Sequence, residues 1–71
     1  MNAPEWLAAY ADKLGVSAPT KDELTAVLDI SAEAAHSSQR IAGPLASWLA
    51  GRAGVSVEEA VRLAKEVSAD S

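Results

Sequence analysis

Apolar residues return every three or four positions through most of this chain, which is the spacing of amphipathic helices. Short breaks with glycine or proline separate four such segments, and no segment shows the alternation typical of a strand. We predict helices at residues 3–14, 21–39, 43–53 and 57–68. The chain has 71 residues, so we predict a single all-α domain over residues 1–71, a compact four-helix bundle-like fold with mostly up-and-down topology.

The ends of these segments carry capping signals. Asn2, Thr20 and Ser56 each precede a helix and are each followed three residues later by glutamate, which is the pattern of a capping box. Gly15 and Gly54 follow the first and third helices, where a glycine can adopt the left-handed conformation that ends a helix. These signals fix most of the predicted boundaries.

The large apolar side chains predict which helix faces pack inward. In the predicted helix 3–14 the inward face is Trp6, Leu7, Tyr10, Ala11 and Leu14, and in 21–39 it is Leu24, Val27, Leu28, Ser31, Ala35 and Ser38. In 43–53 it is Leu45, Trp48, Leu49 and Arg52, and in 57–68 it is Val57, Ala60, Val61, Ala64 and Val67. Trp6 and Trp48 are among them, so we expect both in the core. The second face thins to alanine and serine, so we expect another helix to approach it closely there. Gly51 predicts either a close contact or fraying.

Composition excludes several classes of protein. Ten acidic residues against six basic ones give a net charge of −4, which works against binding to nucleic-acid phosphates. The chain has no cysteine, which excludes disulfides and thiolate chemistry. No apolar run reaches the roughly 18 residues of a membrane span, and we recognise no secretory signal. We therefore expect a cytoplasmic protein without nucleic-acid or membrane partners.

One polar stripe of the second helix invites a functional interpretation. Asp29, Glu33, His36 and Arg40 share the side opposite its apolar face. The stripe is either a solvated face with weak charge pairs, or a recognition surface for a partner protein or an anionic ligand. Under the second hypothesis, His36 and Arg40, extended by Ser37, form the polar centre of the site. Under the first, they stabilise the end of the helix.

The same residues give little support for catalysis. Glu33 and His36 have the spacing of one half of a di-metal carboxylate site, but such sites need two copies and two further carboxylates. Ser37 and Ser38 follow His36 directly, and adjacent helical residues do not face each other. The chain has no nucleophile-elbow or phosphate-loop motif. We predict no enzymatic activity, no metal and no cofactor.

Arg52 is unusual because it falls on the apolar face of its helix. Its aliphatic stem can pack there while the guanidinium reaches solvent at the helix end. Alternatively, it is a cation placed in a groove to meet a carboxylate or phosphate of a partner.

His36, Arg40 and the run Ala42–Gly51 resemble the signature of a small actinobacterial domain family of unknown function. Its members have Ala-Ala-His and then Arg in one helix, and an Ala-Pro-Leu turn into a helix with an aromatic-Leu-x-Gly pattern. Trp6 and the pair Glu58-Glu59 also fit. Members occur alone or attached to proteins similar to molybdenum cofactor guanylyltransferases, so the resemblance implies an accessory role near molybdopterin nucleotide chemistry.

Two functions remain open at this point. The first is a non-enzymatic accessory or protein-interaction domain, as a monomer or weak homodimer, with a guanylyltransferase-like partner implied by the resemblance. The alternative is a small anionic-ligand domain that holds a nucleotide or pterin phosphate through His36 and Arg40. The candidate binding residues are His36, Ser37, Arg40 and Arg52. Ile41 departs from the family pattern, which has proline there.

Overall fold

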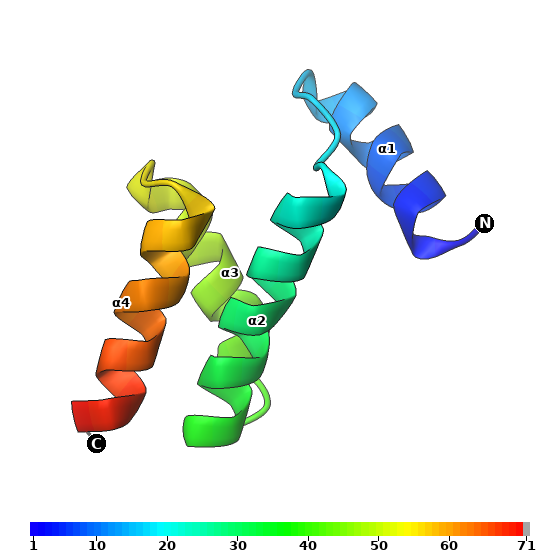
Figure 1. Cartoon of the computed structure of the whole chain (residues 1–71). Helices are drawn as coiled ribbons and strands as arrows, with labels where there is room; N and C mark the ends of the chain where they lie inside the picture. Colours follow the sequence, from blue (N-terminus) through cyan, green and yellow to red (C-terminus); the bar gives the residue numbers. More distant parts are fainter. Residues whose placement is uncertain (71) are drawn as a thin grey trace.

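Four helices make up the described residues, 1–70, of the computed structural model (Figure 1), and those residues contain no strand. They are α1 (Ala3–Leu14), α2 (Lys21–Ser37), α3 (Ala42–Ala53) and α4 (Val57–Asp70). The prediction of an all-α, four-helix bundle-like domain is confirmed. The main boundary difference is that α2 ends at Ser37 rather than at residue 39. Within residues 1–70, no helix combines the length and apolarity needed to cross a membrane.

Two of the predicted capping boxes form completely. The Asn2 side chain accepts a hydrogen bond from the Glu5 backbone N–H at 2.9 Å, and the Glu5 carboxylate accepts one from the Asn2 N–H at 3.1 Å. Thr20 and Glu23 make the same reciprocal pair at 3.1 and 2.8 Å. Gly15 ends α1 at a φ of 79°, in the left-handed region that favours glycine. These local contacts satisfy helix ends without help from the rest of the fold.

The centre of the structure is α2, which packs against α3 on one side and against α4 on the other. α2 and α4 run in the same direction and α3 runs opposite to both (Figure 1). These are the only two helix pairs among residues 1–70 that pack extensively. α1 is connected to the first turn of α2 and points away from the other helices (Figure 1). The bundle therefore consists of three packed helices and one projecting helix.

α3 approaches α2 closely at Gly43, next to Ser31. A Cβ atom added at Gly43 would lie 2.6 Å from Ser31 Oγ and 3.3 Å from the Ser31 carbonyl oxygen. This confirms that another helix approaches the alanine- and serine-rich part of α2. Gly51, in contrast, has open space around the position of its missing Cβ. It lies inside the continuous helix α3, so Gly51 marks neither a close contact nor an early helix end.

The core is small, and both tryptophans lie outside it. Ile30 is the only large side chain that is buried among the described residues, at 3% exposure, although the sequence pattern did not place it on the inward face of α2. Trp6 is 53% exposed, Trp48 60% and Leu28 68%. The prediction that both tryptophans pack in the core was therefore wrong. Trp6 is exposed because no helix covers its face of α1, and Trp48 because α3 packs through its opposite face.

Exchange of Ile30 for alanine should cost far more stability than exchange of Trp48. Ile30→Ala removes a buried side chain and should lower the free energy of unfolding by about 2–5 kcal/mol. Trp48→Ala removes mainly solvated surface and one exposed stacking contact, so its cost should stay below about 1 kcal/mol. Urea denaturation of both variants measures this difference. A large loss of stability in Trp48→Ala would contradict the exposed position of that ring.

The two glycines of α3 should respond in opposite ways to alanine. Gly51→Ala should raise the free energy of unfolding by about 0.5–1 kcal/mol, because it gains helix propensity without a clash. Gly43→Ala should lower the free energy of unfolding by about 1–3 kcal/mol, because the new methyl group pushes α3 away from Ser31 of α2. Thermal denaturation followed by circular dichroism provides the comparison. Equal effects at the two positions would argue against the close contact.

Candidate interaction surface

α3 packs with its small residues inward and its large residues outward. The side turned toward α2 and α4 consists of small, buried or half-buried residues, namely Gly43, Ala46, Ser47 and Ala50. The opposite side, here called the α3 outer face, consists of Leu45, Trp48, Leu49 and Arg52, all exposed. These four residues were predicted to face inward, and that prediction was wrong. The helix approaches α2 too closely at Gly43 for large side chains to fit between them.

Arg52 and Trp48 form a stacked pair on this outer face. The guanidinium carbon of Arg52 lies 4.9 Å from the centre of the indole ring, within the range of a cation–π interaction. Arg52 makes no ion pair with any carboxylate of residues 1–70. The indole ring thus restrains the exposed guanidinium group without neutralising its charge. Such a group is prepared to bind a carboxylate in a second molecule.

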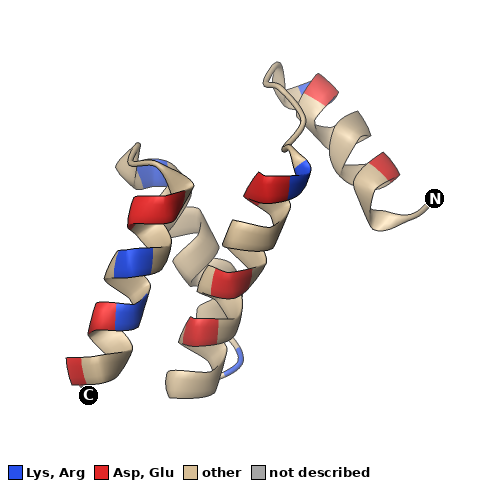
Figure 2. Cartoon of the chain, viewed as in Figure 1, with Lys and Arg blue, Asp and Glu red and all other residues tan. Residues whose placement is uncertain are grey.

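Charge is unevenly distributed along the chain (Figure 2). Residues 34–57, which include all of α3, contain Arg40 and Arg52 but no acidic residue, so all ten acids lie outside this segment. The outer face of α3 therefore combines large apolar side chains with unopposed positive charge in a protein that is acidic as a whole.

The structure separates His36 from Arg40. α2 ends at Ser37, so His36 lies in its last turn while Arg40 belongs to the turn that leads to α3. Both are exposed, but they do not share a helix face as predicted. Under the helix-end hypothesis, Arg40 would stabilise the last turn of α2. That role falls to Ser38, whose hydroxyl and backbone N–H both donate to the Ala34 carbonyl, at 2.6 and 3.1 Å.

The acidic half of the polar stripe joins α2 to α4. Lys65 Nζ lies 3.6 Å from a carboxylate oxygen of Asp29 and 3.8 Å from one of Glu33. Exposed ion pairs of this kind contribute little to stability, but they occupy the two carboxylates within the fold. No group of three potential metal-ligating side chains occurs among residues 1–70. The sequence-predicted stripe is therefore divided between an interhelical contact and the exposed end of α2.

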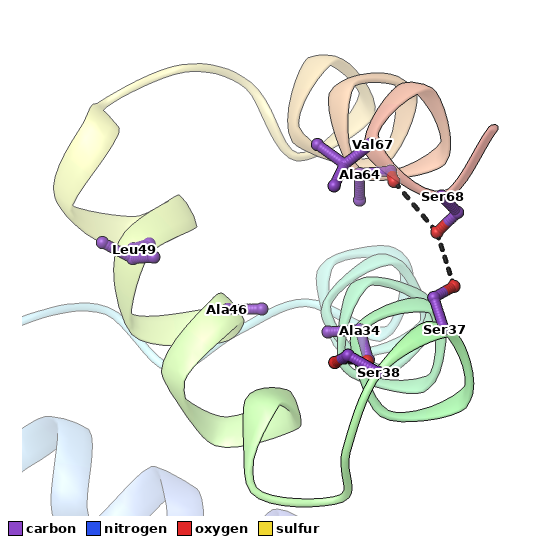
Figure 3. A pocket seen from close by; sticks show the side chains of 8 residues that line it. All are labelled: Ala34, Ser37, Ser38, Ala46, Leu49, Ala64, Val67 and Ser68. Atoms are coloured by element: carbon purple, nitrogen blue, oxygen red, sulfur yellow. Dashed lines mark hydrogen bonds between the residues drawn. The ribbon is translucent and has the colours of Figure 1, made fainter. Parts of the chain in front are cut away.

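An apolar groove separates α3 from α4 on the surface of the bundle. It contains two adjoining cavities of about 350 and 270 Å³. Four residues line both cavities and define what we call the α3–α4 groove, namely Ala46, Leu49, Ala64 and Val67. Figure 3 shows the larger cavity, with Ser37 at its edge and the Ser37 and Ser68 hydroxyl oxygens 2.6 Å apart in a hydrogen bond. Of the four predicted site residues, only Ser37 lines this cavity.

The side chains of α4 form a charge cluster outside the groove. Ser56 caps the helix by accepting a hydrogen bond from the Glu59 N–H at 3.2 Å. The Glu59 carboxylate does not complete the predicted capping box, because it accepts two hydrogen bonds from Arg62, at 2.6 and 2.8 Å. Arg62 also donates to Glu66. The Arg62 hydrogen bond lowers the pKa of Glu59, and the two carboxylates raise the pKa of Arg62.

Comparison with known proteins places the chain in a family. A family model described as a domain of unknown function, DUF6457, matches residues 1–71. The chain belongs to this family. No curated protein matches the chain, and no solved structure does so either. The match agrees with the resemblance noted from the sequence at the level of a family without a defined activity.

The Glu59–Arg62 contact should make the stability of this DUF6457 domain depend on pH. Because the contact lowers the pKa of Glu59, its stabilisation is present above the ordinary glutamate pKa of 4.5 and is lost as pH falls through the lowered value. The difference in unfolding free energy between the wild type and Arg62→Met should therefore shrink on acidification. Urea denaturation of both proteins at several pH values from neutral to acidic measures this difference. Arg52→Met is the control, since Arg52 pairs with no carboxylate of the described chain, and its difference should not depend on pH.

Proposed function

We propose that this domain is a non-enzymatic protein-interaction module that binds its partner through the α3 outer face. The observation that carries this proposal is the orientation of α3, which uses small residues for its own packing and leaves its largest side chains in solvent. Contiguous exposed apolar surface is typical of interaction sites in soluble proteins. Tryptophan and arginine are also the residues most enriched among those that dominate binding energy.

The Trp48–Arg52 stack gives this surface a polar specificity element. Since the ring already fixes the guanidinium, little side-chain freedom is lost when Arg52 binds a carboxylate. Leu45 and Leu49 flank the stack and can exclude water from it. The surface therefore suits an apolar patch of a protein that carries a carboxylate at its centre.

For the identity of the partner, the support is the family resemblance described above. On that basis we propose that the domain is an accessory module of actinobacteria that docks onto a molybdenum cofactor guanylyltransferase-like enzyme in the cytoplasm. The role is associative, since fold and family alone do not specify chemistry.

The alternative of an anionic ligand held by His36 and Arg40 has weaker support. Both residues lie in the acid-free segment 34–57, which favours anions. However, neither side chain lines either cavity of the α3–α4 groove, and both are exposed on separate elements. A phosphate-binding site normally gathers several donors in one concave position.

Capture of a purified guanylyltransferase-like enzyme by the immobilised domain tests the proposal. Trp48→Ala and Arg52→Glu should each weaken binding at least tenfold, because each removes a central contact of the surface. Leu28→Ala, which removes an equally exposed apolar side chain from α2, should bind like the wild type.

A double variant, His36→Ala with Arg40→Ala, distinguishes the two candidate functions. It should retain capture if the α3 outer face is the contact surface. Loss of capture in this folded double variant, with full binding by Trp48→Ala, would overturn the assignment to the α3 outer face and place the contact at His36 and Arg40.

A further inference from the structure

Most of the large apolar side chains of α1 are not covered by the chain that contains it. Among described residues, Trp6, Tyr10 and Leu14 are at least half exposed, Leu7 is half-buried, and the only buried residue of α1 is the small Ala11. The rings of Trp6 and Tyr10 lie 5.1 Å apart and form one apolar ridge. Isolated helices shorter than about 12–15 residues are marginal in water even when well capped. This helix of 12 residues therefore requires a surface to pack against.

The α3–α4 groove lacks the complementary helix. α3 and α4 both pack on α2, but they do not pack extensively on each other. The groove between them is apolar, with Leu49 on one wall, Val67 on the other and the buried Ile30 lining its smaller cavity. Amphipathic helices bind to grooves of this kind through residues spaced one turn apart. Trp6, Tyr10 and Leu14 have that spacing.

The exposed area is larger than one folded chain of this size should have. The structure exposes 5472 Å², whereas a folded monomer of 7.3 kDa is expected to expose about 4,200 Å². The excess is about 1,300 Å² by this scaling. It is more than the roughly 800 Å² that each partner contributes to a standard protein interface. The chain thus carries enough additional surface for a stable dimer contact.

We propose that two copies of this chain exchange their α1 helices, so that each α1 lies in the α3–α4 groove of the other copy. The connection between α1 and α2 favours a partner's groove over its own. Gly15 holds a left-handed conformation, the Val16 N–H donates to the Ala11 carbonyl at 3.0 Å, and Thr20 begins the capped α2. These contacts direct α1 away from the bundle (Figure 1). Exchange of a whole element across a two-fold axis fills both grooves at once.

The charges beside the two apolar surfaces are complementary. Lys13 lines a shallow depression on α1 together with Trp6 and Tyr10. On α4, Glu59 and Glu66 stand one turn before and one turn after Leu63, which lines the smaller cavity of the groove. Together with Asp70, these carboxylates outnumber the single cation Arg62 on that edge. In contrast, pairing of two α3 outer faces would bring arginines together, so we do not assign the dimer contact to that face.

The exchange leaves Leu45, Trp48 and Arg52 of the α3 outer face free, and only Leu49 belongs to both surfaces. Leu49 borders the groove, whereas the preceding residue, Trp48, points about 100° away around the helix axis. Arg52 lies over the Trp48 ring and is therefore on the same side of α3 as Trp48. The dimer contact and the proposed partner contact therefore adjoin at Leu49, while Trp48 and Arg52 belong to the partner contact alone.

Sedimentation velocity of the full chain across a range of concentrations tests the exchange. We expect the wild type to sediment as a dimer that dissociates on dilution. Trp6→Ala and Val67→Lys should each raise the dimer dissociation constant at least tenfold while α2, α3 and α4 stay folded, because both positions are exposed within one chain. Lys13→Glu should also weaken the dimer. Leu28→Ala is the control and should behave like the wild type.

Crosslinking shows which helix fills the groove, since the natural chain has no cysteine. Tyr10→Cys chains are mixed with Val67→Cys chains and treated with a short bis-maleimide. We expect a covalent product that contains one chain of each kind, and none when Leu28→Cys replaces Val67→Cys. A monomer at all concentrations, or a dimer that survives Trp6→Ala and Val67→Lys, would overturn the exchange. In a second experiment, one chain carries both Tyr10→Cys and Val67→Cys; a crosslink confined to single chains there would also overturn the exchange, because it would mean that α1 folds onto its own groove.

Discussion

The close contact between Gly43 and Ser31 is the constraint on which the arrangement of this domain depends. It brings the α3 backbone against α2 so closely that a Cβ atom at position 43 would force Ser31 or one of the two helices to move. A helix that packs so closely must present small residues along its whole contact side, which here continues through Ala46, Ser47 and Ala50. Its leucines and its tryptophan must then face outward. The exposed apolar surface is thus a consequence of how the core is built.

Most of the fold could be predicted because its signals are local. Helix caps such as Asn2 with Glu5 and Thr20 with Glu23 form from residues three positions apart and do not depend on tertiary contacts. The capping box predicted at Ser56 is not completed by Glu59, and the reason is also a local contact. There the Glu59 carboxylate had two competing local partners, and it binds the charged guanidinium of Arg62 rather than a neutral backbone N–H.

The exposure of the α3 outer face could not be predicted in the same way, because periodicity identifies the faces of a helix but not which face lies inside. α3 has a large apolar face and a small apolar face, and the usual assumption that larger residues are buried selects the wrong one. The signal that was available is the Gly43 and Ala46 spacing, which permits close approach. The pairing of His36 with Arg40 failed for a different reason. Ser38 leaves helical geometry, with φ −138° and ψ −97°, and ends the helix before Arg40.

The two-sided character of α3 has a consequence for how this domain can evolve. Core residues and contact residues come from one helix but do not touch the same neighbours, so their substitutions should act nearly independently. Under the proposed function, a change at Leu45 or Arg52 would alter partner preference without loss of packing, whereas any side chain at position 43 would have to displace Ser31. Relatives that share this helix could therefore diverge in the proteins they recognise while they keep one fold.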